Sequence, residues 1–330
     1  MNHKISVILT VLNEVKTIKA TIENLTNQSR MPDEIVIVDG GSEDGTIETI
    51  QKLSAENQII KLIVQKNINI SQGRNIAIAN ARFPLIAATD SGCRPEKNWL
   101  ENMMEPIRND PDIDVVKGIV YPDPANLFER IGGCFLAGHL DQYDASMYPL
   151  SGRASLYKKE IWERAGGYPE WLYTGEDTLF HRKLQHMGAN IQLARNAVVY
   201  WRPRQTYYKM AKMCFLYGRG NGRIGDSISG AGYHLRNYGI LFLLFGASLF
   251  FPWFFLVFIA SILYFYFTST RKTVKKIQQK IVDKRVLWMG PMIVLIRNIA
   301  TCLGLLLGHL EYRYRHPLKK KLADYMNNSL

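Results

Sequence analysis

The chain has 330 residues, which is enough for one large domain with appended elements. Its net charge of +12 is uneven, because residues 1–235 hold 27 Lys and Arg against 26 Asp and Glu, whereas residues 236–330 hold 14 against 3. A nearly neutral N-terminal region disfavours a nucleic-acid-binding protein, so we expect no nucleic-acid partner. Basic clusters beside long apolar runs indicate contact with anionic lipid headgroups instead. The four cysteines form no CxxC pair, which argues against a zinc site.

The first 120 residues alternate between strand and helix patterns. Short, continuous apolar runs predict four strands, at Ile5–Val11, Glu34–Val38, Ile59–Val64 and Leu85–Thr89. Helical patterns lie between and after them, at 14–27, 46–56 and 71–81. Continuous apolar strands separated by helices are typical of a parallel sheet that is covered on both faces. We therefore expect an α/β fold with a mainly parallel sheet flanked by helices.

The pattern is mixed from about residue 113 to 217. Strands are predicted at Ile113–Val120 and Asn190–Tyr200, and helices at Lys158–Ala165, Asp177–Met187 and Tyr207–Tyr217. We place the end of this first domain at residue 235.

Residues 236–330 are predicted to form a membrane region. No charged residue occurs from Asn237 to Thr270, and apolar segments lie at about 238–268 and 286–310. The first segment exceeds the roughly 20 residues that span a bilayer, but a hairpin bent near Pro252 is an open alternative to a single crossing. A single crossing would place the basic stretch 271–285 outside, against the positive-inside tendency. For the second segment, a soluble core helix is the alternative interpretation.

Polar residues follow three of the predicted strands. Asn13 and Glu14 follow the first, the loop 39–46 (DGGSEDGT) follows the second, and Asp90 follows the fourth. Ligands of parallel sheets bind beyond the carboxyl ends of the strands. Glycines let the backbone approach a ligand closely, and Asp39 is placed where a carboxylate could hold a ribose or base. The plainer interpretation of this motif alone is an ordinary loop between a strand and a helix.

Two further carboxylate motifs carry chemistry. Asp90 at a strand end suits a hard divalent cation that bridges to phosphate oxygens, although an Asp that caps a turn is the plainer interpretation. Glu176 and Asp177 follow Thr174-Gly175 at a predicted helix start. They could complement the helix dipole, or one of them could act as general base on an acceptor hydroxyl.

Taken in order, these motifs, with Gly73-Arg74-Asn75 and Leu150–Ala154 between them, resemble the inverting family 2 glycosyltransferases with the GT-A fold, over about residues 4–223. The resemblance implies an enzyme that transfers a sugar from a nucleotide-diphosphate sugar. It assigns Asp177 as the catalytic base, with Glu176 as the alternative. Asp90 would bind the metal and diphosphate. The implied donor-binding residues are Asn13, Glu14, Asp39, Gly41, Ser42, Arg74, Asp90 and Arg219.

Gly92 departs from the family pattern, because it replaces the acid in the third place of the Asp-x-Asp metal motif. We still expect Mg²⁺ or Mn²⁺ on Asp90, donor phosphates and water. The expected partners are a nucleotide-sugar donor, a lipid-linked or polysaccharide acceptor of the cell envelope, and membrane lipids. We expect a single- or multi-pass protein of the cell membrane with its catalytic domain in the cytoplasm. A sugar nucleotidyltransferase and a non-catalytic membrane scaffold with this fold are the alternatives.

Overall fold

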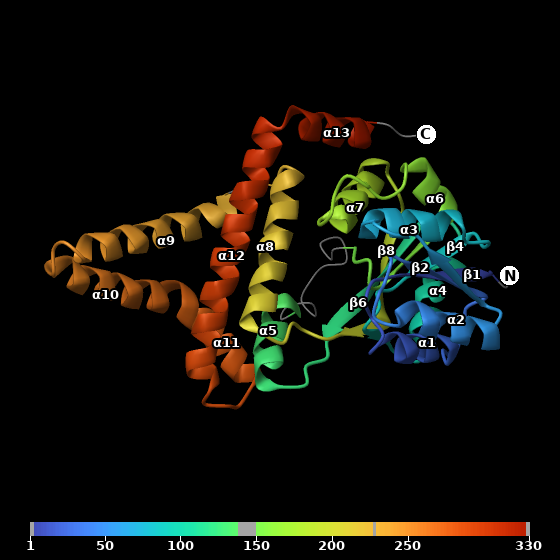
Figure 1. Cartoon of the computed structure of the whole chain (residues 1–330), viewed down its shortest axis with the longest axis horizontal. Coiled ribbons are helices and arrows are strands. Elements are labelled where there is room, and N and C mark those ends of the chain that lie inside the picture. Colours follow the sequence, from blue (N-terminus) through green and yellow to red (C-terminus); the bar gives the residue numbers. More distant parts are fainter. Residues whose placement is uncertain (1–2, 138–149, 227–228, 328–330) are drawn as a thin grey trace. The chain divides into compact units, whose positions relative to one another are not determined.

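The computed structural model describes residues 3–137, 150–226 and 229–327 (Figure 1). The chain divides into two compact units. The first comprises residues 1–123, 139–202 and 322–330, and the second comprises 124–138 and 203–321. The second unit thus begins before residue 235, and the predicted boundary at 235 stays a prediction.

The first unit is built on an eight-stranded mixed sheet with the order β3-β2-β1-β4-β7-β6-β8-β5. β1, β2, β3 and β4 form a parallel group, β6 pairs with β8 in parallel, and the pairs β4–β7, β6–β7 and β5–β8 are antiparallel. The strands are β1 (Ile5–Val11), β2 (Glu34–Asp39), β3 (Ile60–Val64), β4 (Leu85–Ala88), β5 (Cys93–Pro95), β6 (Val115–Pro122), β7 (Ser155–Lys158) and β8 (Ile191–Trp201).

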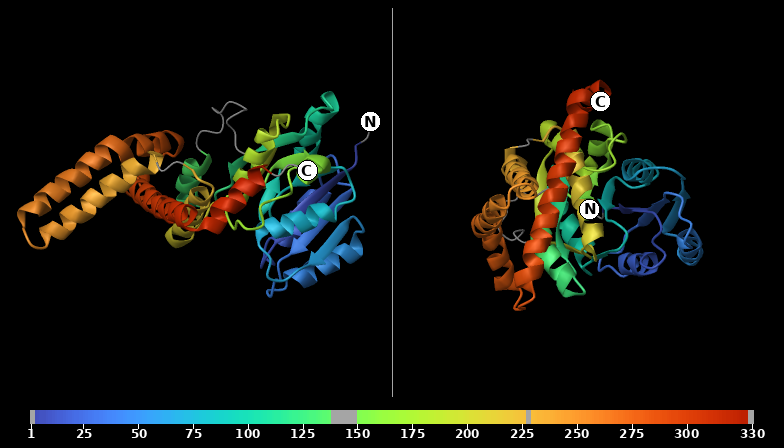
Figure 2. Two further views of the ribbon diagram at one scale, coloured as in Figure 1. Left: turned by 90° about the horizontal axis from the view of Figure 1, so that it is seen from above. Right: turned by 60° about the vertical axis from the view of Figure 1, so that its left-hand side comes forward.

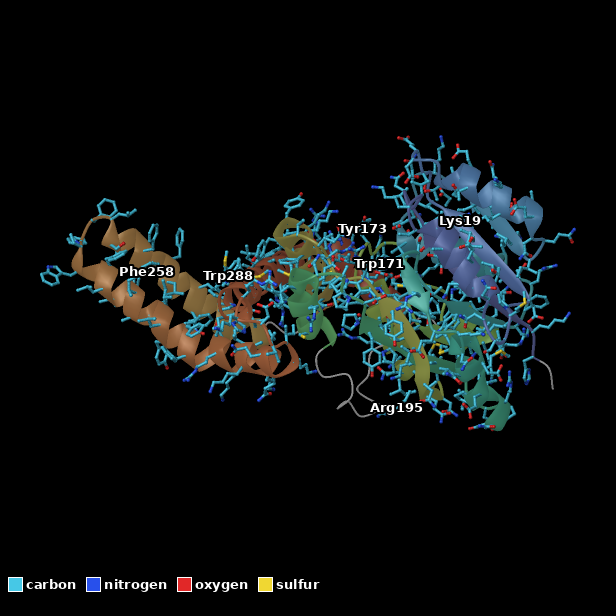
Figure 3. The ribbon with its side chains drawn as sticks, turned by 90° about the horizontal axis from the view of Figure 1, so that it is seen from below. Lys19, Trp171, Tyr173, Arg195, Phe258 and Trp288 are labelled. Atoms are coloured by element: carbon cyan, nitrogen blue, oxygen red, sulfur yellow. The ribbon has the colours of Figure 1, made fainter. Side chains whose placement is uncertain are left out.

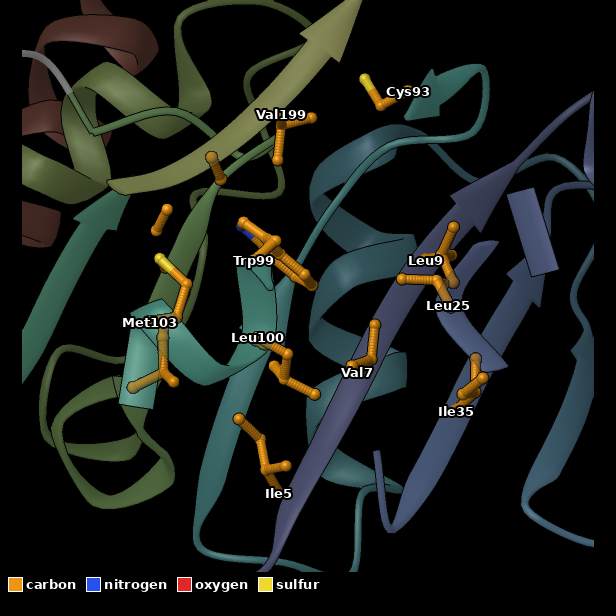
Figure 4. Packing of buried hydrophobic residues seen from close by; sticks show 14 of the residues in the cluster. Ile5, Val7, Leu9, Leu25, Ile35, Cys93, Trp99, Leu100, Met103 and Val199 are labelled. Atoms are coloured by element: carbon orange, nitrogen blue, oxygen red, sulfur yellow. The ribbon is translucent and has the colours of Figure 1, made fainter. Parts of the chain in front are cut away.

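Helices cover both faces of this sheet. Their bounds are α1 (Ile18–Thr26), α2 (Thr46–Glu56), α3 (Ile70–Ala79), α4 (Trp99–Asn109), α6 (Lys159–Arg164) and α7 (Glu176–His186). Apolar side chains of α1, α2 and α4 pack on one face in a single buried cluster, part of which Figure 4 shows around Val7, Leu25 and Trp99. Those of α3, α6 and α7 pack on the other face. Because both faces are buried, the central strands can be continuously apolar.

The predicted strands and helices are present, with shifted ends. The first helix begins at Ile18 rather than residue 14, because Asn13 has a positive φ of 57° and residues 13–15 donate to the loop after β2. The prediction that this helix starts at 14 is therefore wrong. The elements β5, β7, α4 and α5 (Leu127–Ala137) were not predicted.

The second unit is helical within the described residues. It contains α5, α8 (Tyr207–Arg223), α9 (Ser229–Ser248), α10 (Trp253–Phe265), a π-helical turn (Tyr266–Thr270), α11 (Arg271–Lys280) and α12 (Val286–Tyr314). α13 (His316–Asn327) starts in this unit and ends in the first. Among the described residues, α12 alone passes as a membrane-spanning helix, by its length and composition.

The apolar segment 238–268 is not one helix. α9 ends at Ser248 and α10 begins at Trp253, and the two lie side by side as a hairpin in both figures that show the ribbon from different directions (Figures 1 and 2). Of the two alternatives for this segment, the structure has the hairpin with its bend at Pro252.

α8 and α12 pack unusually closely. A Cβ atom added at Gly218 or Gly222 of α8 would clash with the backbone of α12, and one at Gly304 or Gly308 of α12 would clash with the backbone of α8. Small residues spaced four apart on facing helices allow such an approach.

Candidate active site

The loops that follow β1 and β2 are joined by hydrogen bonds. The backbone N–H of Asn13 donates to Ser42 Oγ at 2.8 Å, and Asn13 Oδ1 accepts from the backbone N–H of Glu43 at 3.0 Å. The backbone N–H of Glu14 donates to Thr46 Oγ1 at 2.8 Å. The parallel register of the two strands, which aligns Val11 with Asp39, places these loops at the same edge of the sheet.

Asp39 is fully buried and organises its own loop. Its Oδ1 accepts from the backbone N–H groups of Gly41 at 2.8 Å and Ser42 at 2.6 Å, and its Oδ2 accepts from Ser42 Oγ at 2.7 Å. Gly41 has a φ of 101°, which a residue with a Cβ rarely adopts. Asp39 therefore shapes the loop, and a direct contact of its carboxylate with a nucleoside stays a prediction.

Arg74 lies at the centre of the candidate site, although it is only 4% exposed. It comes from α3, whose N-terminus is capped by Asn69. Its Nη1 donates to Glu176 Oε1 at 2.9 Å and its Nη2 to Asp90 Oδ1 at 3.0 Å. The guanidinium also lies over the Tyr168 ring, 5.4 Å from its centre. Arg74 thus joins the acid at the end of β4 to the acids at the start of α7.

Asp90 is held by a second arginine that the site assignment from the sequence omitted. Arg153 Nε lies 3.6 Å from Asp90 Oδ2, and its guanidinium lies over the Trp201 ring. Burial raises the pKa of the Asp90 carboxyl, but Arg74 and Arg153 outweigh this and hold the pKa below its usual value. The signal that could have found Arg153 is register: β4 and β7 pair antiparallel with Ala88 opposite Ser155, so residue 153 comes opposite residue 90.

The two carboxylates at the start of α7 have different surroundings. Glu176 is 7% exposed and is bonded to Arg74, whereas Asp177 is half-buried and its Oδ1 accepts from the Thr178 backbone N–H at 2.8 Å. Burial and the neighbouring Asp177 charge raise the pKa of Glu176 to about 7, against the opposing effect of Arg74. Gly175 precedes them with a φ of 82°, which turns the chain into the helix.

Arg219 lies in the second unit, on α8. Its Nη2 donates to Glu311 Oε1 of α12 at 2.6 Å, and Arg223 contacts the same carboxylate. The described structure thus gives Arg219 a protein partner, and its predicted contact with the donor diphosphate stays a prediction.

The described residues do not form a metal cluster of their own. Within 3–137, 150–226 and 229–327, no group of three or more His, Cys, Asp or Glu residues is arranged to hold an ion. Asp90 offers one carboxylate, and its side chain is 23% exposed.

Comparisons with known proteins agree with this architecture. Residues 6–166 match the family model described as glycosyl transferase family 2. The chain is 25% identical over 223 residues to glycosyltransferase AglE of Haloferax volcanii, covering 66% of this chain and 72% of that protein. A second relative is a dolichyl N-acetyl-α-D-glucosaminyl phosphate 3-β-D-2,3-diacetamido-2,3-dideoxy-β-D-glucuronosyltransferase of Methanococcus voltae. It is 26% identical over 233 residues, which cover 66% of this chain and 73% of that protein.

A solved structure shares the fold. The mannosyltransferase PcManGT from Pyrobaculum calidifontis, solved in complex with GDP-Man and Mn²⁺, superimposes with a TM-score of 0.58 and 16% identity, covering 95% of this chain and 88% of that one. The family match and the relatives support a glycosyltransferase rather than the nucleotidyltransferase alternative. Residues 6–166 therefore form a family 2 glycosyltransferase domain, and the chain is a glycosyltransferase with a GT-A-like catalytic sheet.

Proposed function

We propose that this enzyme transfers a sugar from a nucleotide-diphosphate sugar to a hydroxyl of a membrane-associated or cell-envelope acceptor, with inversion at the anomeric carbon. The acceptor oxygen bonds to the anomeric carbon while the bond to the diphosphate oxygen breaks, and the diphosphate keeps that electron pair. The acceptor proton passes to the carboxylate of Asp177. The single observation that carries the proposal is the buried Arg74, which brings Asp90 on the diphosphate side next to the start of α7 on the base side.

Asp177 is favoured over Glu176 as the base. A general base must reach the acceptor hydroxyl and keep a free lone pair. Glu176 is nearly inaccessible, and its carboxylate is bonded to Arg74. Asp177 is half-buried, and among the described residues its hydrogen-bond donors are the backbone N–H and the hydroxyl of its neighbour Thr178. Glu176 then serves to fix Arg74 and the first turn of α7.

The donor is proposed to lie over the loops after β1, β2 and β4, between Asn13, Gly41 and Asp90. Arg153 beside Asp90 adds positive charge for the diphosphate. A Mg²⁺ or Mn²⁺ ion fits here, because such ions use one or two carboxylates and complete their shell with substrate phosphates and water. Asp90 would hold it, and the ion would neutralise charge on the departing diphosphate.

A lipid-linked acceptor is the class we favour. The Methanococcus voltae relative is named for a dolichyl phosphate-linked acceptor, and the second unit of this chain carries an apolar α12 and a basic C-terminal third. We place the enzyme at the cell membrane with its catalytic unit on the cytoplasmic side, where nucleotide sugars are made.

The experiment that tests this function incubates purified full-length protein with a panel of nucleotide sugars, with and without membrane lipids, and measures nucleotide release. We expect release with one donor class and its stimulation by lipid-linked acceptors. Absence of release with every donor and acceptor, from protein that binds nucleotide, would refute the proposal.

A further inference from the structure

The α9–α10 hairpin exposes apolar side chains on all of its sides. In α10, the four consecutive residues Phe254–Val257 are each at least 41% exposed, and consecutive helical residues point in different directions. At the bend, Phe250 and Trp253 are each 80% exposed. Figure 3 shows side chains that stand outward along the hairpin, where Phe258 is labelled. A protein partner would cover one side, whereas acyl chains surround a helix, so the lipid phase is the occupant that fits.

The arms of the hairpin are too short to cross a bilayer. α10 has 13 residues and the uncharged π-helical turn continues it for five more, so at about 1.5 Å per residue this arm is at most about 27 Å long. The part of α9 beyond Arg236 is about 18 Å long by the same rise. The hydrocarbon core of a bilayer is about 30 Å thick, so neither arm crosses it, and the shorter α9 arm limits the hairpin to little more than one leaflet.

Both ends of the hairpin are basic. Arg236 lies in α9 before the apolar stretch, and Arg271 and Lys272 begin α11 directly after the π-helical turn. Lys275 and Lys276 of α11 are exposed, while Val274 and Ile277 are buried. Cations at the base of an apolar hairpin match anionic headgroups of a single membrane surface.

α12 packs against α8, a helix with exposed lysines that are costly to place in the hydrocarbon core of a bilayer. α8 packs against it in parallel, and the glycines described above meet α12 between about residues 301 and 309. α8 carries Lys209 and Lys212, both exposed. One lysine at the centre of a membrane helix lowers insertion roughly 10²-fold. If α12 crossed the bilayer along its length, α8 would be drawn in with it.

α12 instead has the pattern of a helix that lies in the interface. Most of its exposed apolar residues recur at intervals of three and four, which places them in one stripe: Trp288, Met292, Leu295, Ile299, Leu303, Leu306 and Leu310. Leu287 and Leu307 are exposed beside it. Gly304 and Gly308 face α8. The hairpin extends crosswise to α8 and α12 (Figure 1), so a hairpin that points into the membrane leaves α12 lying along the surface.

We propose that this enzyme is monotopic: the α9–α10 hairpin dips into one leaflet without crossing it, and α12 lies along the surface of that same leaflet with its apolar stripe toward the acyl chains. This proposal rests on the membrane association in the proposed function. It keeps both ends of the hairpin and the C-terminal tail on the side of the catalytic unit.

Single cysteines in the otherwise unchanged full-length chain, labelled with an impermeant maleimide, test the topology. Lys19→Cys marks the catalytic unit, Lys275→Cys follows the hairpin and Lys320→Cys follows α12, and all three positions are exposed. We expect no labelling of any of them in intact cells and labelling of all three in inverted vesicles, above the unmodified chain. Labelling of Lys320→Cys alone in intact cells would show that α12 crosses. Labelling of both Lys275→Cys and Lys320→Cys there would show that the hairpin segment crosses.

A second experiment tests the hairpin itself. Purified protein is floated with vesicles of phosphatidylcholine and phosphatidylglycerol. The double variant Phe250→Asp, Trp253→Asp should bind at least 10²-fold more weakly, whereas Met31→Asp, at an exposed apolar site of the catalytic unit, should bind like the unmodified chain. Both should retain nucleotide release from the donor in detergent. Unchanged flotation of the double variant would overturn the insertion of the hairpin. If the double variant still floats but no longer dimerises in detergent, the hairpin is an interface between copies of the chain. Loss of nucleotide release in every protein, with flotation intact, would refute the proposed function and leave the membrane proposal standing.

Discussion

Asp177→Asn is the sharpest test of the chemistry. Asn has nearly the same shape, and its amide oxygen can accept from the Thr178 backbone N–H as the carboxylate does, so the start of α7 should be unchanged. What is lost is basicity. General-base catalysis contributes about 10²–10⁴-fold, or roughly 3–5 kcal/mol of barrier, so kcat should fall by that factor. The affinity for nucleotide should stay within about twofold, because the loops proposed to bind the nucleotide lie after β1 and β2. The measurement is nucleotide release at saturating donor, with calorimetry for nucleotide binding.

The matched control is Glu176→Gln, one residue away. Gln keeps an oxygen for Arg74 Nη1 and removes only the charge of a group that is nearly inaccessible. Its kcat should therefore stay within about tenfold of the original enzyme, since a positioning group does not take the proton. If Glu176→Gln lost turnover while Asp177→Asn kept it, the base assignment would move to Glu176. If both kept turnover, neither would be the base.

Three further outcomes are expected. Asp90→Asn keeps an acceptor for Arg74 but weakens cation binding, so it should raise the Mg²⁺ or Mn²⁺ concentration needed for half-maximal transfer; full activity of the original enzyme in excess chelator would exclude the metal. Gly152→Ala adds a Cβ that collides with the Arg74 guanidinium, so it should cost about 1–3 kcal/mol of stability and impair transfer, and an unshifted melting temperature would contradict this packing. The pKa of Glu176 in the folded protein, about 7, exceeds its usual value of 4.5, so its contribution to stability is complete below pH 4.5 and is lost as pH rises to 7, by on the order of 3 kcal/mol. Glu176→Gln lacks this loss, so its melting temperature should rise relative to the original enzyme across that range, and a constant difference would refute the raised pKa.

The strand ends were predictable from the sequence, whereas the contacts between them were not. Apolar runs followed by Asn13 and Asp39 indicate a parallel sheet with a polar edge, because both signals are local. The pairing of Arg74 with Glu176 joins residues 102 positions apart, and no local pattern specifies such a pair. The hairpin bend at Pro252 was left open for the same reason. Composition shows that a segment is apolar, but its path depends on what it packs against.

The position of the proposed base depends on α3 as much as on α7. Asn75, next to Arg74, accepts at Oδ1 from the Tyr168 backbone N–H at 2.8 Å and from Trp162 Nε1 at 3.1 Å, and its Nδ2 donates to the Tyr168 carbonyl at 2.9 Å. Asn75 therefore holds the chain that precedes α7, and its neighbour Arg74 holds Glu176, the first acid of α7. The same helix reaches Asp90 through Arg74. Because these side chains are largely withdrawn from solvent, the acid at the end of β4 and the start of α7 are held in register by short, low-dielectric contacts. In the proposed reaction, the sugar lies between Asp90 on the leaving-group side and the start of α7 on the acceptor side. The distance between these two sides is therefore set by α3.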